Sequence, residues 1–95
     1  MKIIFKGESL SVKKSWYAVN KRISLSLIDE EGSPYMTASV NLMNENMAEG
    51  ETAIKDYSEN EGILSSLIKA EIVSEPLRFA SSGFISNIPI VKVLI

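Results

Sequence analysis

Apolar and polar residues alternate along two neighbouring stretches of the chain, residues 23–28 and 35–42. A period of two is typical of strands with one buried face. The segment between them, Asp29–Pro34, contains a glycine and a proline and has the composition of a turn. The pattern therefore predicts a β-hairpin on which the rest of the chain packs. Its apolar face comprises Ile23, Leu25, Leu27, Met36, Ala38, Val40 and Leu42.

The register of this hairpin follows from keeping its apolar residues on one face. With Leu27 opposite Met36, the next pairs are Leu25 with Ala38 and Ile23 with Val40. The other face then carries small hydroxyl side chains, because Ser26 meets Thr37 and Ser24 meets Ser39. A slip by one residue would bury these hydroxyls, so we expect a tightly defined register. The hydroxyl face is either plain solvated sheet or a flat docking surface.

Four further stretches predict strands and one predicts a helix. Residues 2–5 and 10–16 form a hairpin across Gly7, residues 51–56 form a short strand, and residues 84–95 form the last strand, with Pro89 at an edge or a bulge. Ser58 and Glu61 have the spacing of a capping box, which predicts a helix over about 59–70. Its apolar stripe comprises Ile63, Leu64, Leu67 and Ile68. The fold class is α+β: one domain, residues 1–95, with a mainly antiparallel sheet of about five strands and one α-helix (about 59–70) packed on one face.

Composition argues against an enzyme or a metal protein. The 95 residues include no histidine and no cysteine, so the commonest general base, the commonest metal ligands and any thiolate nucleophile are missing. The carboxylates of Asp29–Glu31 lie in a solvated turn, and neither this run nor Asn44–Asn46 has the spacing of a calcium loop. We expect a non-catalytic protein with no cofactor and no metal.

The charge of the chain is distributed unevenly. Residues 1–22 carry a net charge of +5, residues 29–61 carry −8, and the whole chain carries −2. If the acidic segment forms one surface, it suits a basic protein partner and repels nucleic acid. The candidate partner-binding residues are Asp29, Glu30, Glu31, Glu45, Glu49 and Glu51. The alternative is that these carboxylates are simply solvated.

The aromatic pair Trp16–Tyr17 lies among basic residues at positions 13, 14, 21 and 22. Such a pair can be a stacking platform for nucleic acid. The favoured interpretation is that Trp16 fills the core and Tyr17 lies at its margin, because a single-strand binder of this size normally carries a positive net charge. A nucleic-acid partner is therefore not expected.

Hydropathy predicts no association with a membrane. No run of 18 apolar residues is present, and only three apolar residues follow one another near the start, too few for a signal peptide. We expect a cytoplasmic protein.

The motif Gly32-x-Pro34-Tyr35, followed by Val40-Asn41-Leu42, resembles a small family of unknown function that is common on conjugative elements, plasmids and phages of gut bacteria. The likeness covers roughly residues 7–94. It departs from the family at Ile88, where a tyrosine is frequent, and at Tyr57–Asn60, where asparagines are frequent. The other residues that carry it are Ala53-Ile54-Lys55-Asp56, Leu67-Ile68, Pro76, Arg78, Ser82-Gly83-Phe84 and Pro89.

The resemblance implies a small accessory protein of a mobile element, and it implies no catalytic residues. The first hypothesis is a protein-binding module, such as an inhibitor of a host defence system of the anti-CRISPR kind, acting through the acidic segment. The second is a structural or assembly protein, or a homo-oligomer that pairs through the apolar strand Ile88–Ile95. The third is a nucleic-acid binder that uses the basic N-terminal segment.

Overall fold

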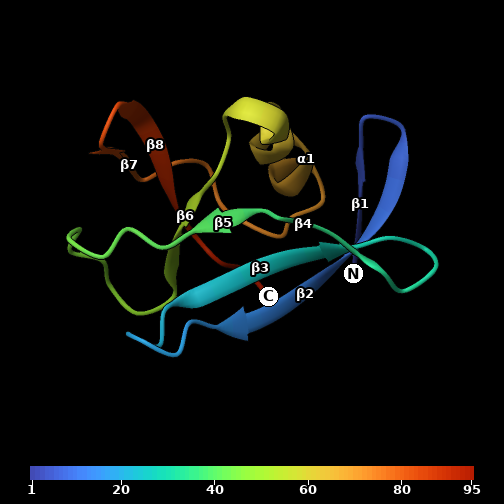
Figure 1. Ribbon diagram of the computed structural model, residues 1–95, viewed down its shortest axis with the longest axis horizontal. Helices are drawn as coiled ribbons and strands as arrows, with labels where there is room; N and C mark the ends of the chain where they lie inside the picture. The colour runs from blue at the N-terminus through green and yellow to red at the C-terminus, as the bar shows by residue number, and fades with distance from the viewer.

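The computed structural model describes residues 1–95 and contains two four-stranded antiparallel sheets (Figure 1). The α+β class is confirmed, whereas the expectation of one sheet of about five strands is wrong. The first sheet has the order β1-β2-β3-β4 and the second has the order β5-β6-β8-β7. The strands are β1 (Lys2–Phe5), β2 (Glu8–Trp16), β3 (Ile23–Ile28), β4 (Pro34–Thr37), β5 (Ser39–Val40), β6 (Glu51–Ile54), β7 (Arg78–Ser82) and β8 (Ile85–Lys92).

The first sheet is a meander of hairpins, as the alternating pattern predicts. The β1–β2 hairpin turns at Lys6 and Gly7, whose φ angles of 51° and 79° are those of a tight hairpin turn. In the β3–β4 hairpin, Leu27 lies opposite Met36 and Ser26 lies opposite Thr37, so the predicted register is confirmed at these pairs. Beyond them the predicted strand 35–42 divides into two.

The division occurs at Ala38, where the chain passes from one sheet to the other. The N–H of Ala38 donates to the carbonyl oxygen of Leu25 in β3 (2.8 Å), while its own carbonyl oxygen accepts from the N–H of Lys55 (2.8 Å). Val40 then pairs with Ala53 in β6. The predicted pair of Ile23 with Val40 is therefore wrong, because the main chain beyond Ala38 is bonded to the second sheet.

The hydroxyl of Ser39 supports this crossing. Its Oγ accepts a hydrogen bond from the N–H of Leu25 (3.0 Å) and is bonded to the hydroxyl of Tyr17 (2.8 Å). If β4 had continued alongside β3, its main chain would have offered an acceptor to the N–H of Leu25. The hydroxyl of Ser39 accepts from this N–H instead. Ser39 is only 3% exposed, so the expectation that it lies on a solvated or docking face is wrong at this position.

The helical segment is shorter than predicted. A 3₁₀ turn, η1 (Ser58–Asn60), precedes the α-helix α1 (Ile63–Lys69). The predicted capping box is wrong: Ser58 lies in η1 with a φ of 56°, and its side chain caps nothing. Gly62, with a φ of 96°, separates the two helical segments. Asp56 caps α1 instead, because its Oδ1 accepts from the N–H groups of Gly62 (2.9 Å) and Leu64 (3.1 Å).

The capping role of Asp56 is testable. We expect Asp56→Ala to lower the free energy of unfolding by about 1–2 kcal/mol, because two N–H groups at the start of α1 lose their acceptor. Ser58→Ala is the matched control and should change stability by less than about 0.5 kcal/mol. Urea unfolding of both variants measures the difference. Equal losses would contradict the assignment of the cap to Asp56.

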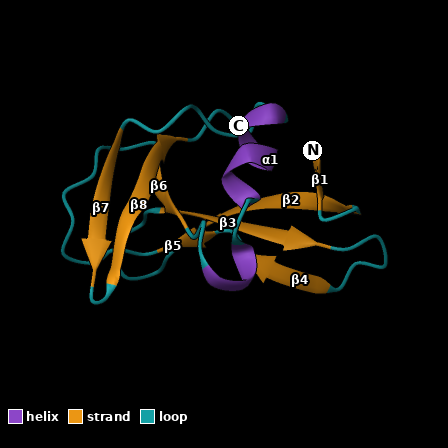
Figure 2. Ribbon diagram, turned by 90° about the horizontal axis from the view of Figure 1, so that it is seen from above, coloured by secondary structure: helices purple, strands orange, loops and turns teal.

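The main core lies between the first sheet, α1 and the inner parts of β6 and β8. Fourteen buried apolar residues form this cluster, including Ile63 and Leu67 from the helix and Leu25 and Leu27 from β3. The prediction that the helix covers the apolar face of the hairpin is thus confirmed, and in Figure 2 α1 lies across the sheet strands. A second cluster of five buried residues fills the other face of the second sheet: Leu42, Ala53, Ala80, Ile88 and Ile90.

The last strand is interior rather than uncovered. β8 lies between β6 and β7, so the expectation that it offers a free pairing edge is wrong. Its pairing with β6 covers only Ile90–Lys92, and Pro89 lies just beyond that stretch. Proline is tolerated here because the side of β8 on which its missing N–H would lie has no strand partner at that residue.

Candidate functional site

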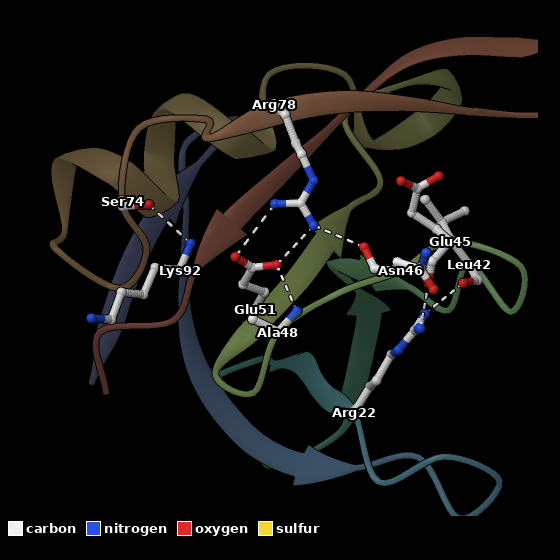
Figure 3. A network of polar contacts seen from close by, with 9 residues as sticks. All are labelled: Arg22, Leu42, Glu45, Asn46, Ala48, Glu51, Ser74, Arg78 and Lys92. Carbon is white, nitrogen blue, oxygen red and sulfur yellow. Dashed lines mark hydrogen bonds and ion pairs between the residues drawn. The ribbon is translucent and has the colours of Figure 1, made fainter.

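The segment between β5 and β6, residues 41–50, contains no helix or strand and is held in place by both arginines of the chain (Figure 3). We call it the 41–50 loop. The guanidinium of Arg22 donates to the carbonyl oxygen of Leu42 (2.5 Å) and to that of Glu45. Arg78 donates to the carbonyl oxygen of Asn46 (2.9 Å) from the opposite side. These bonds use the main chain of the loop and leave half of its residues exposed to solvent.

Two asparagines add a third attachment. Asn20, in the turn between β2 and β3, donates to the side-chain oxygen of Asn41 at the start of the loop (3.1 Å). The side-chain oxygen of Asn20 also accepts from the N–H of Arg22 (3.2 Å). The same turn therefore orients Arg22 and contacts the loop.

Glu51 anchors the far end of the loop. Its carboxylate pairs with the guanidinium of Arg78 (2.9 and 3.4 Å) and accepts from the N–H of Ala48 (3.0 Å). The hydrogen bond from Arg78 and then the bond from Ala48 hold the pKa of Glu51 below its usual value, and the carboxylate raises the pKa of Arg78. The Glu51 side chain is only 14% exposed. It therefore serves the structure of the loop rather than a free acidic surface.

The pairing of Glu51 makes the stability of the protein sensitive to acid. Because its pKa in the fold lies below the ordinary value of 4.5, its stabilising contribution is present above that pH and is lost as the pH falls through the folded pKa. We expect the difference in unfolding free energy between the wild type and Glu51→Gln to be larger at neutral pH than at about pH 3. Urea titrations at the two pH values measure it. The control is Glu8→Gln, at an exposed position without an ion pair. If the wild type and Glu51→Gln differed in unfolding free energy by the same amount at both pH values, the pairing would be contradicted.

Trp16 lies beside the loop and is not part of the core. It is 59% exposed, so the favoured interpretation from the sequence is wrong. Trp16 is the last residue of β2 and lies opposite Ile23, which is itself buried in the main core. The ammonium of Lys14 lies 5.6 Å from the ring centroid. Trp16 lines a groove of about 620 Å³ together with residues of the β2–β3 turn and residues 47–51 of the chain.

The structure divides the six predicted acidic residues into two groups. Asp29, Glu30 and Glu31 lie in the turn between β3 and β4, and the 41–50 loop lies at the other end of the molecule's long axis (Figure 1). Oδ1 of Asp29 accepts from the N–H groups of Glu31 and Ser33, both at 2.9 Å, so Asp29 stabilises its own turn. Glu45, Glu49 and Glu51 belong to the loop and its anchor. The acidic segment does not form one surface.

The carboxylates of the chain are not gathered into a group that could bind a metal ion. No cluster of three or more carboxylate, imidazole or thiol side chains is placed to hold a metal ion. No helix has the length and apolarity required to cross a bilayer. Comparisons with models of known protein families, with curated proteins and with solved structures find no match to this chain.

The two arginines are the residues that reasoning from the sequence missed. One signal was available: the chain has ten basic residues, and only Arg22 and Arg78 among them are arginine. The guanidinium group presents several donors in a planar fork, whereas lysine has a single ammonium. The use of arginine at two isolated positions therefore indicated two sites where several acceptors converge.

Proposed function

We propose that this chain is a non-catalytic protein-binding module whose recognition surface is the 41–50 loop together with Trp16. The observation that carries the proposal is the use of both guanidinium groups on carbonyl oxygens of one loop. A loop held by its main chain presents its side chains in a fixed arrangement. Loops on a rigid scaffold are the usual place for binding residues.

Pre-ordering of the loop favours binding. Ordering a flexible segment on association costs about 0.5–1.5 kcal/mol for each immobilised side chain. Here the three attachments at Leu42, Glu45 and Asn46 are made before any partner arrives. Met43 and Asn44 are exposed between these attachments. They are therefore available for contact at a reduced entropic cost.

Trp16 supplies the apolar anchor of the proposed surface. Tryptophan is among the residues most enriched at the energetic centres of protein interfaces, and its exposure to water is unfavourable without a partner. The groove beside it is lined by both the β2–β3 turn and the end of the 41–50 loop. A partner side chain seated in this groove contacts the tryptophan and the loop together.

The carboxylates of Glu45 and Glu49 favour a basic partner. Neither is in an ion pair, in contrast to Glu51, which is neutralised by Arg78. The electrostatic part of the proposal therefore rests on two residues of the loop. Glu30 and Glu31, at the other end of the molecule, provide a matched control with the same charge.

The family resemblance gives the proposed setting. A small accessory protein of a phage or conjugative element that binds a protein without catalysis suits the role of inhibitor of a host defence system, for example an anti-CRISPR protein. Nucleic-acid-binding defence proteins carry basic surfaces, which is the charge that the loop favours. This assignment of a target rests on the resemblance together with the charge of the loop.

Site-specific photo-crosslinking in a bacterial host tests the binding surface. A photoreactive amino acid replaces Asn44 in the loop or, as a control, the exposed Ser65 of α1. We expect one protein to be crosslinked from position 44 and not from position 65. The double variant Glu45→Lys/Glu49→Lys should lose this crosslink, whereas Glu30→Lys/Glu31→Lys should keep it. Equal crosslinking from both positions would reject the loop as the recognition surface.

Phage plating tests the proposed inhibition. Expression of the chain in a strain with an active CRISPR–Cas system should raise the plating efficiency of a targeted phage. The variant Glu45→Lys/Glu49→Lys should not. Unchanged plating against every system tested would reject defence inhibition while leaving the crosslinking result to decide the binding surface.

Exposure of Trp16 also favours a second candidate, a single-strand nucleic-acid interface. Two of the four basic residues around it are occupied, however: Lys14 donates to the carbonyl oxygen of Ile95 (2.7 Å), and Arg22 holds the loop. We therefore expect fluorescence anisotropy with single-stranded DNA and RNA to detect no binding tighter than about 100 µM at physiological salt. Tight binding that weakens with salt and is lost in Trp16→Ala would favour the nucleic-acid interface over the protein-binding surface.

A further inference from the structure

The free edge of β7 differs from the other three sheet edges of the molecule. Exposed edge strands are usually protected from pairing by lysines, prolines or a very short length. β1 begins at Lys2 and is followed by Lys6, β4 begins at Pro34, and β5 has only two residues. β7 has five residues, no lysine and no proline. Figure 2 places β7 at one end of the molecule, with β8 on one side and no further strand on the other.

The pairing with β8 shows which main-chain groups of β7 face outward. Pro89 has no N–H, so its pair with Phe79 cannot exchange two hydrogen bonds and is of the non-hydrogen-bonded kind. The N–H and C=O of Phe79 therefore point away from β8. Hydrogen-bond direction alternates along a strand, so the same groups of Ser81 point outward as well. No main-chain bond from a loop or turn covers either residue.

The outward edge of β7 is regular. Ala80 pairs with Ile88 and Ser82 pairs with Ile85, so β8 advances by three residues where β7 advances by two. The extra residue therefore belongs to β8, where Asn87 has a φ of 56°. A bulge in the edge strand itself would have interrupted its row of donors and acceptors. Here that row is intact.

Exposed apolar side chains surround this edge. Phe79, on the strand, is 58% exposed. Leu77, just before it, is also exposed, and Phe84, at the tip of the β7–β8 hairpin, is fully exposed. Gly83, with a φ of 59°, occupies the first turn position and leaves Phe84 at the second. A cluster of exposed aromatic residues next to an unprotected edge is typical of an interaction surface.

We propose that β7 pairs with β7 of a second copy of this chain, in antiparallel orientation about Ala80, to form one continuous eight-stranded sheet. In this register Phe79 lies opposite Ser81 of the second copy. The outward groups of both residues then form four main-chain hydrogen bonds. The two Phe79 side chains occupy diagonal positions on one face, about 7–8 Å apart, which is within reach of aromatic rings.

The edge is complementary to itself, which favours a second copy over an unrelated strand. Leu77 lies three residues before Ala80, and Phe84 lies four residues after it. In the antiparallel pair, Phe84 of each copy therefore lies near the Pro76–Leu77 segment of the other copy. Arg78 is the only charged residue of β7, and it is bonded to Glu51 of its own chain (2.9 Å). In the proposed register Arg78 lies opposite Ser82 of the second copy, so no like charges meet.

The expected association is moderate. Pairing of two short strands with a few apolar side chains lies near the lower limit of about 1,000 Å² for a specific interface. We expect a dissociation constant on the order of 10 µM. This inference is independent of the proposed binding function, because its test requires no partner protein.

Sedimentation equilibrium of the purified chain, up to about 500 µM, tests the proposal. The wild type should be a dimer at the upper end of this range. Ser81→Pro removes an outward N–H without removing a bond to β8, and Phe79→Lys places a charge on the edge; each should raise the dissociation constant at least about tenfold. Ile4→Lys, which changes an exposed apolar residue on the edge strand β1, is the matched control and should remain dimeric.

Amide hydrogen exchange locates the contact. Exchange at Phe79 and Ser81 should slow as the wild-type concentration rises, and in Ser81→Pro the slowing at Phe79 should require at least about tenfold more protein. Circular dichroism confirms that each variant is folded. A monomer throughout the range, a dissociation constant in Ser81→Pro equal to that of the wild type, or a dimer without protection of these two amides would each overturn the proposal.

Discussion

Replacement of Ser39 by alanine is expected to lower the free energy of unfolding by about 2–3 kcal/mol, which corresponds to roughly 15 °C in Tm for a domain of this size. The buried Ser39 Oγ accepts from the N–H of Leu25 (3.0 Å) and is bonded to the Tyr17 hydroxyl (2.8 Å). Alanine leaves the buried N–H of Leu25 without an acceptor at the point where the chain passes between the sheets. Thermal and urea unfolding measure the loss.

Two controls isolate the role of the hydroxyl. Ser24→Ala changes a serine of β3 that is also nearly buried but bonds to neither Leu25 nor Tyr17, and we expect it to cost less than about 1 kcal/mol. Tyr17→Phe removes one of the two bonds, so the double variant with Ser39→Ala should cost less than the sum of the single changes. Strict additivity would contradict a direct bond between the two hydroxyls.

Replacement of Arg22 by methionine is expected to loosen the 41–50 loop and to weaken capture of the proposed partner at least about tenfold, because an unordered loop must then be ordered on binding. Methionine keeps part of the apolar stem and removes the two bonds to the carbonyl oxygens of Leu42 and Glu45. Hydrogen bonds to charged groups contribute about 1.5–3 kcal/mol each, so loss of the two bonds should also lower the unfolding free energy by at least about 3 kcal/mol. Amide exchange across residues 42–47 and crosslinking from position 44 measure the two effects.

Arg22→Lys separates charge from geometry. Lysine keeps the positive charge but cannot present the planar fork that reaches both carbonyl oxygens, so we expect it to resemble Arg22→Met rather than the wild type. Lys21→Met, at the adjacent position, removes a charge that forms no hydrogen bond or ion pair with the loop and should leave exchange unchanged. Loop exchange in Arg22→Met equal to that of the wild type would reject the clamping role.

The local parts of the fold were predictable because they depend on neighbouring residues. Alternation in residues 23–28 and 35–37 defines which side chains face the core, and it predicts that Leu27 lies opposite Met36. The β1–β2 hairpin follows from Gly7, and the buried stripe of α1 follows from helical spacing. Each of these features depends only on residues of one hairpin or one helix, so residue propensity and hydrophobic periodicity are enough to predict it.

The candidate site was predictable only in part. The acidic composition of residues 29–61 drew attention to Glu45, Glu49 and Glu51, which the fold gathers at one loop. The same composition also included Asp29–Glu31, which the fold places at the other end. Composition identifies the kind of residue available, but it does not say which charges are free and which are paired, as Glu51 is with Arg78.

The sequence by itself determined the α+β class, the first hairpins, the alternation that divides core from surface, and the absence of histidine and cysteine. Only the tertiary structure decided that the strand after Tyr35 crosses between two sheets at Ala38, that Trp16 lies outside the core, and that both arginines converge on one loop. The physical reason is the separation along the chain over which each kind of interaction acts. Periodicity and turn chemistry act between residues close in the chain, whereas the bonds of Ala38 to Leu25 and Lys55, and of Arg78 to Asn46, join residues that become neighbours only when the sheets assemble.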